Sequence, residues 1–204
     1  MEGLDNAENV MQQLYDLPVY RKHLERRGNN QTIMLGFSDG TKDGGYLKAN
    51  WEIYETKEQL TKVSENNGIK VIFFDGRGGP PARGGGKTHD FYASQGKTIA
   101  NNKIELTIQG QTITSVFGNK DQAKYNFEQL LTAGIENDVF QNNKKDLTEK
   151  ERHLIEELAE ISFQKYSDLK AHPMFVPYLQ EMSTLEYYGK TNIGSRPSKR
   201  GAGN

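Results

Sequence analysis

The segment that decides the fold reads Val71-Ile72-Phe73-Phe74-Asp75-Gly76-Arg77-Gly78-Gly79, and it continues through two prolines to Arg83-Gly84-Gly85-Gly86-Lys87-Thr88-His89. Its first part, 69–75, is apolar enough for a strand buried on both faces, which is typical of parallel sheets, and a helical pattern follows near His89. The chain before it repeats this order, with a strand predicted over 31–37, a polar, glycine-rich loop over 38–45 and a helix that ends at Asn67-Gly68. Two such units imply parallel strands, and their loops lie at the end of the sheet where ligands bind.

Apolar spacing predicts further helices over 4–14, from Pro18 to Gly28, from Asp121 onward and from a capping box at Thr148-x-x-Glu151. Seven apolar residues of the two later helices are expected in the core: Ala123, Phe127, Leu130, Leu131, Leu154, Leu158 and Ile161. Between the early and late helices, 104–108 alternates and 112–117 looks extended, so we expect a hairpin inserted beyond the main sheet. We expect residues 1–204 to be a single incomplete domain whose polar end, 191–204, is mobile because it has little to bury.

Composition excludes several classes of protein. The chain has 204 residues, 34% of them hydrophobic and 26% charged, which is ordinary for a soluble globular domain. The net charge is -1, so no overall field attracts nucleic acid or an anionic membrane. There is no cysteine, hence no disulfide or thiolate site, and no apolar stretch is long enough to span a membrane. We therefore expect a cytoplasmic protein with neither nucleic-acid nor membrane partners.

The arginine-rich stretch is typical of an anion site. Glycines let backbone N–H groups approach an anion closely, and the guanidinium groups of Arg77 and Arg83 can hold phosphate or carboxylate oxygens in pairs. The alternative is a flexible, solvated basic loop, since glycine and proline accumulate in ordinary connections. A phosphate loop of the Walker type is excluded, because that pattern requires glycine where this chain has Pro81.

Two other places carry candidate chemistry. Asp39, in Ser38-Asp39-Gly40-Thr41-Lys42-Asp43, follows a strand end where a divalent cation can use its carboxylate, with Lys42 close by to counter phosphate charge. A turn or a helix cap is the alternative for this segment. Arg196 is the third candidate, with an exposed tail charge as its alternative. The four histidines have no metal-ligand spacing, and only His89 lies beside the proposed site.

Three segments resemble signature motifs of phosphoenolpyruvate carboxylase, in the family's order: Met34 to Gly45, Phe74 to His89, and Gly194-Ser195-Arg196-Pro197-Ser198-Lys199-Arg200. The resemblance covers nearly the whole chain, which is similar to an internal piece of the family's C-terminal catalytic half. It implies an α/β fold, a partial (β/α) TIM-type barrel with many additional helices. It also implies a lyase that joins phosphoenolpyruvate and bicarbonate to give oxaloacetate and phosphate with Mg²⁺ or Mn²⁺.

The resemblance also implies roles for individual residues. Asp39 would be a metal ligand, Lys42 a cationic catalytic residue, and Arg77 a catalytic ligand of the substrate phosphate on the glycine loop. Arg83 matches a catalytic arginine of the bicarbonate step, which in feedback-inhibited members also holds the loop when aspartate binds. Arg196 would be a second substrate-binding arginine. One position departs from the family, because Asp75 stands where a histidine is common, and an acid there could pair with a neighbouring arginine.

The family's second metal carboxylate and its catalytic-base histidine would fall upstream of Met1. We therefore expect the isolated chain to be inactive and to bind Mg²⁺ weakly or not at all, since Mg²⁺ keeps its waters unless several anionic ligands compete. The alternative is a non-catalytic interaction piece that associates with itself or with the rest of the enzyme, or within a homo-oligomer of the parent.

Overall fold

The computed structural model of the chain describes residues 2–78, 87–108, 111–140, 146–184 and 187. The chain divides into two compact units, Met1–Phe163 and Gln164–Asn204. In the second unit, the last turns of α9 (Glu149–Ala171) lead to the short helix α10 (Phe175–Met182). Residues 191–204, predicted to be mobile, lie outside the described residues. No helix in the described ranges is both long and apolar enough to cross a membrane.

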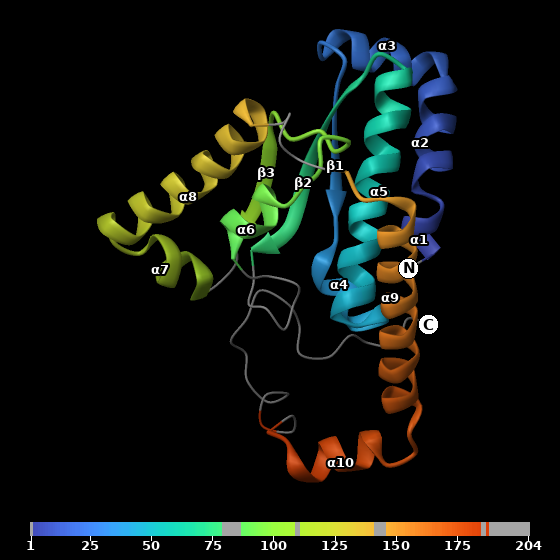
Figure 1. Ribbon diagram of the computed structural model, residues 1–204, viewed down its shortest axis with the longest axis vertical. Coiled ribbons are helices and arrows are strands. Elements are labelled where there is room, and N and C mark those ends of the chain that lie inside the picture. Colours follow the sequence, from blue (N-terminus) through green and yellow to red (C-terminus); the bar gives the residue numbers. More distant parts are fainter. Residues whose placement is uncertain (1, 79–86, 109–110, 141–145, 185–186, 188–204) are drawn as a thin grey trace. The chain divides into compact units, whose positions relative to one another are not determined.

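The first unit contains a parallel sheet of three strands in the order β1 (Asn30–Leu35), β2 (Lys70–Gly78) and β3 (Ile104–Ile108) (Figure 1). Asn30 is the partner of Lys70 and Leu35 of Asp75, so β1 pairs over its whole length and β2 continues beyond it. The prediction of consecutive parallel strands is confirmed. This is an α/β fold with a small sheet and many helices.

The predicted hairpin is wrong. β3 pairs in parallel with β2 in the main sheet, and the next segment is a helix, α7 (Gln111–Phe117). Threonine and isoleucine at alternate positions suggested a strand, but tertiary packing overrides that preference. α7 packs on α8 (Lys120–Val139), where the rings of Phe117 and Phe127 lie 5.1 Å apart.

The long helix α5 (Tyr46–Asn66) contacts β2 and lies beside α2 (Ala7–Asp16) (Figure 1). The single helix predicted over 4–14 is divided into α1 (Glu2–Asp5) and α2, whereas α3 (Pro18–Arg26) follows as the sequence predicted. α5 ends as expected at Asn67-Gly68, where Gly68 takes a φ of 68° that side-chain-bearing residues rarely adopt. The largest fully buried apolar side chains of this region are Tyr15, Leu24, Phe37, Ile53, Leu60 and Phe73.

The segment after β1 is a helix rather than the predicted loop. α4 runs over Phe37–Gly44 and packs on both α5 and β2. Its first residue, Phe37, is 1% exposed, so apolar burial fixes the start of the helix despite a glycine-rich sequence. Thr41 donates its hydroxyl to the carbonyl oxygen of Phe37. Asp39 therefore lies in the first turn of a helix.

The apolar residues expected in the core on the two later helices are largely exposed. Phe127 and Leu131 of α8 are 60% and 64% exposed, and Leu154, Leu158 and Ile161 of α9 are all at least half exposed. The inward positions are instead the small residues Ala133 and Ala159, which are fully buried. Small residues let the helices approach their neighbours closely, so the buried stripe differs from the one that large apolar residues suggested.

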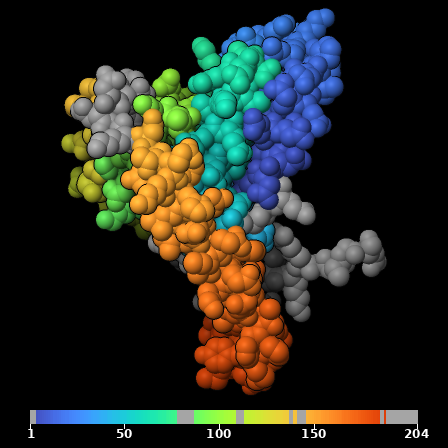
Figure 2. Space-filling model, turned by 45° about the vertical axis from the view of Figure 1, so that its right-hand side comes forward, coloured from blue at the N-terminus to red at the C-terminus, as the bar shows by residue number. Residues whose placement is uncertain are grey.

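The start of α9 follows the sequence prediction. The backbone N–H of Thr148 donates to the carboxylate of Glu151 at 2.9 Å, and the N–H of Glu151 donates to the Thr148 hydroxyl at 3.3 Å, which confirms the capping box. Arg152, in the next turn, forms an ion pair of 2.9 Å with Glu58 of α5. Figure 2 shows this part of α9, in amber, lying against α5, in teal.

Candidate functional site

The candidate residues gather at the C-terminal ends of β1 and β2. Leu35 and Asp75 are register partners. Beyond this point β1 leads to Asp39 on α4, and β2 continues to Arg77 near its own end. The two strands approach closely here, because a Cβ on Gly76 would lie 3.0 Å from the carbonyl oxygen of Leu35. Asp39 and Arg77 therefore lie at the same edge of the sheet, as parallel strands predicted.

Arg77 belongs to β2 itself, which corrects the prediction that it stands on the glycine loop. Its side chain is only 5% exposed, and its guanidinium carbon lies 3.9 Å from the centroid of the Phe91 ring and 5.8 Å from that of Phe37. Burial lowers the pKa of Arg77 from its ordinary value, yet arginine keeps its charge in proteins. Among the described residues its Nε–H group has no hydrogen-bond partner. A buried cation with an unpaired donor is electrostatically suited to an anion.

Asp39 and Lys42 are exposed residues on one face of α4. Their side chains are 68% and 57% exposed and form an ion pair of 3.2 Å. A cavity of about 400 Å³ lies beside them, lined by Asp39, Asp43 and apolar residues of α1, α2 and β1. Carboxylate oxygens are the donors that hard divalent cations prefer, so the donor chemistry of Asp39 and Asp43 fits Mg²⁺ or Mn²⁺.

A buried network lies behind Arg77. The Lys57 ammonium of α5 lies 2.8 Å from Oδ2 of Asp75, with the two side chains 1% and 0% exposed. The Tyr92 hydroxyl, on α6 (Thr88–Ala93), donates to the same oxygen at 2.8 Å. Burial lowers the pKa of Lys57, which Asp75 partly restores, and burial raises the pKa of Tyr92. The acid at position 75 thus pairs with a lysine, whereas the sequence suggested an arginine.

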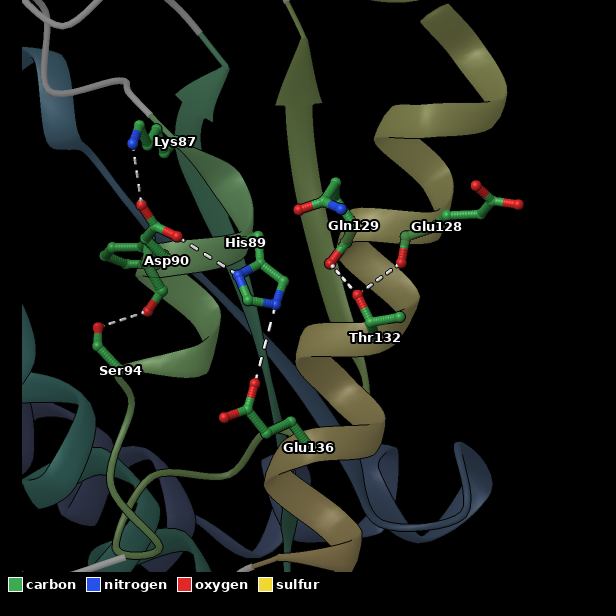
Figure 3. Close-up of polar contacts among 9 residues, drawn as sticks. Lys87, His89, Asp90, Ser94, Glu128, Gln129, Thr132 and Glu136 are labelled. Atoms are coloured by element: carbon green, nitrogen blue, oxygen red, sulfur yellow. Dashed lines mark hydrogen bonds and ion pairs between the residues drawn. The ribbon is translucent and has the colours of Figure 1, made fainter. Parts of the chain in front are cut away.

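His89, which the sequence placed beside the proposed site, connects α6 with α8. Its ring lies between two carboxylates, with Nδ1 3.4 Å from Asp90 and Nε2 3.8 Å from Glu136 (Figure 3). Lys87 approaches Asp90 at 3.6 Å on the other side. Within the described part of the chain, no three histidine, aspartate or glutamate side chains are grouped to hold a metal ion. The contact is a polar link between helices.

Sequence comparisons decide the family. A family model described as phosphoenolpyruvate carboxylase matches residues 1–204. The chain belongs to the phosphoenolpyruvate carboxylase family. It is 36% identical over 201 residues to a phosphoenolpyruvate carboxylase of Corynebacterium efficiens and 35% identical over 203 residues to one of Corynebacterium glutamicum. Each match covers 98% of this chain and 22% of the relative, so the chain spans about a fifth of the length of these relatives.

Of the site residues expected for a phosphoenolpyruvate carboxylase, Asp39, Lys42 and Arg77 lie at one end of the sheet. Arg83 and Arg196 lie outside the described residues.

Lys57 was not foreseen from the sequence, although its position carried a signal. It lies between Ile53 and Leu60 on the helix face that is buried, and a lone lysine at such a spacing indicates a buried partner.

Proposed function

We propose that this chain forms part of the active site of a phosphoenolpyruvate carboxylase, which converts phosphoenolpyruvate and bicarbonate to oxaloacetate and phosphate. The family supports the reaction class, and one observation supports the site: the buried guanidinium of Arg77 lies at the same end of the sheet as the Asp39 carboxylate. The three parallel strands are consistent with part of a (β/α) barrel, which we propose as the fold of the complete catalytic domain.

In this proposal Arg77 binds the phosphate of phosphoenolpyruvate. Its Nε–H and terminal N–H groups donate to phosphate oxygens, while the rings of Phe91 and Phe37 limit the access of water to the guanidinium. A bicarbonate oxygen attacks phosphorus and the bond to the enol oxygen breaks, which gives carboxyphosphate and an enolate. In the transition state the negative charge of the transferred group is spread over its oxygens, and a fixed buried cation stabilises that charge without reorganisation.

Asp39 would hold the divalent cation, with Asp43 in the same cavity. A bound Mg²⁺ or Mn²⁺ supplies positive charge that stabilises the developing enolate oxygen. Lys42, next to Asp39, can counter phosphate charge from the exposed side, and we propose that Arg83 and Arg196 complete the set of cations. One carboxylate with a single nearby partner binds Mg²⁺ weakly, so we propose that the isolated chain does not turn over.

The test is oxaloacetate formation, measured by coupled oxidation of NADH. We expect no turnover by the isolated chain and activity in a chimera where the chain replaces the matching segment of the Corynebacterium glutamicum relative. In that chimera Arg77→Met should lower kcat by about 10²–10³-fold, the usual effect of removing a donor to a transition-state anion. The exposed Lys62→Met is the control. Full activity of the isolated chain, or of the Arg77→Met chimera, would contradict the proposal.

A second candidate function is association through α8. Tyr125, Phe127 and Leu131 are each at least 60% exposed, and a cavity of about 740 Å³ lies between this helix, Tyr92 and Ile104. Exposed apolar surface of this kind marks interaction sites. Sedimentation of the isolated chain at several concentrations tests it: we expect concentration-dependent association that Leu131→Ser reduces, and a monomer throughout would exclude self-association.

A further inference from the structure

Alternate residues of β2 share one face of the strand and form a row. Phe73, Asp75 and Arg77 are separated by two positions each, and the pairing of β2 with β3 is irregular between Asp75 and Gly78. Their contacts with residues of α5 and α6 place all three side chains on one side of the sheet. All three are at most 5% exposed. Two helices supply the residues that cover this row, with Lys57 on α5 and Phe91 and Tyr92 on α6.

The centre of the row is a neutral charge pair. Lys57 and Tyr92 both contact Oδ2 of Asp75 at 2.8 Å, and the Lys57 ammonium also lies 5.0 Å from the centroid of the Phe73 ring. A carboxylate shared by residues from two helices ties both helices to the strand. Neither Lys57 nor Asp75 can move to water without leaving a buried charge behind, so the pair fixes α5 on β2, and the hydrogen bond from Tyr92 fixes α6 on the same carboxylate.

Phe91, the neighbour of Tyr92 in α6, contacts Arg77, so the position of α6 on β2 also decides where this ring meets the guanidinium. Its ring centroid lies 3.9 Å from the guanidinium carbon of Arg77 and 5.3 Å from the Lys57 ammonium, so one aromatic ring contacts two cations. Phe37 meets the same ring edge-on, with centroids 5.5 Å apart and planes at 76°. The ring therefore limits the positions that the guanidinium can take, because cations prefer the face of an aromatic ring.

We infer that Lys57, Asp75 and Tyr92 are positioning residues, which act through Phe91 to hold the guanidinium of Arg77 in one orientation at the end of β2. The row and the residues that cover it hold two buried cations, Lys57 and Arg77, and one buried carboxylate, Asp75. The Asp75 carboxylate compensates the charge of Lys57, so the positive charge of Arg77 stays available to bind an anion. The ligand assigned to Arg77 rests on the proposed function, whereas the positioning of Arg77 rests on this geometry alone.

Nuclear magnetic resonance of the ¹⁵N-labelled 204-residue chain tests the inference. The Nε–Hε signal of Arg77, assigned by its loss in Arg77→Lys, reports the position and the solvent exchange of the guanidinium. In the unmodified chain we expect a displaced signal that exchanges at least about tenfold more slowly than those of exposed arginines.

Tyr92→Phe removes only one hydroxyl and leaves no buried charge unpaired, so it should keep the fold and yet speed the exchange of the Arg77 Nε–H group. Asp75→Asn and Lys57→Met should have larger effects, and Lys62→Met, on the exposed face of α5, should have none.

A thermal melt and a titration with inorganic phosphate accompany each variant. If Tyr92→Phe and Lys57→Met lower the melting temperature but leave the Arg77 signal and its exchange unchanged, the network is only a packing element and the inference is wrong. If the Arg77 signal responds to the variants but phosphate never shifts it, positioning holds and the proposed phosphate ligand fails. If the Arg77 signal responds to the variants and to phosphate, and phosphate binds more weakly to Tyr92→Phe, the positioning role and the phosphate ligand are both supported.

Discussion

The Lys57 ammonium and the Asp75 carboxylate lie 2.8 Å apart, and neither side chain is exposed by more than 1%. Each charge is therefore tolerated only because of the other, since removing one member of such a pair leaves an uncompensated charge in a low-dielectric interior. The pair joins α5 to β2 immediately behind the strand end that carries Arg77.

The buried pair predicts a non-additive effect on stability. Lys57→Met alone should lower the free energy of unfolding by about 3–5 kcal/mol, and Asp75→Asn alone should also destabilise the chain. The double variant should cost clearly less than the sum, because neither charge remains. Urea unfolding followed by circular dichroism measures all three. Additive losses would show that the two side chains do not interact.

The phenol of Tyr92 predicts a loss of stability at alkaline pH. Burial, the Asp75 charge and the hydrogen bond to Asp75 raise the pKa of Tyr92 in the folded chain, whereas an unfolded tyrosine ionises near pH ~10. Above that pH the folded state then binds more protons than the unfolded state. The contribution of Tyr92 to the free energy of unfolding is therefore complete below about pH 10 and is lost as the pH rises further.

Tyr92→Phe should make the alkaline decline shallower. Unfolding free energies measured from pH 8 to 11 would show this, with the 60% exposed Tyr125→Phe as the matched control. An unchanged slope in Tyr92→Phe, or an equal change in the control, would contradict the assignment.

The capping box at Thr148 and Glu151 predicts a smaller, local effect. Thr148→Ala removes the hydroxyl that accepts from the Glu151 N–H group, and it should cost about 1 kcal/mol of stability. Thr132→Ala is the control, because Thr132 lies within a helix and caps none. Hydrogen exchange at the first turn of α9 should rise only in Thr148→Ala, and equal losses in both variants would argue against a capping role.

Local rules in the sequence predicted the parallel order of β1 and β2, the ends of α5 and the start of α9. Hydrophobic runs, a positive-φ glycine and a capping box act over a few residues, so they can be recognised without a fold. The approach of Asp39 and Arg77 to one sheet edge followed from the geometry of parallel strands.

Other features depend on tertiary packing and could not be predicted in this way. α4 forms over Ser38-Asp39-Gly40 because Phe37 is buried against neighbouring elements. The inward faces of α8 and α9 are set by Ala133 and Ala159, while larger residues such as Leu131 remain exposed. Lys57 finds its partner 18 positions along the chain, a pairing that requires the strand and helix to be placed first.

The most direct test of the account is the relaxation of the ³¹P nucleus of phosphoenolpyruvate by Mn²⁺ in the presence of the chimera and without bicarbonate, because it requires one anion to meet both Arg77 and a cation at Asp39. We predict a relaxation enhancement, beyond that of Mn²⁺ and phosphoenolpyruvate in buffer, that is lost both in Arg77→Met and in Asp39→Asn and is retained in Lys62→Met. Phosphoenolpyruvate that binds through Arg77 with no enhancement, or an enhancement that survives Asp39→Asn, would contradict the claim that these two residues share a ligand.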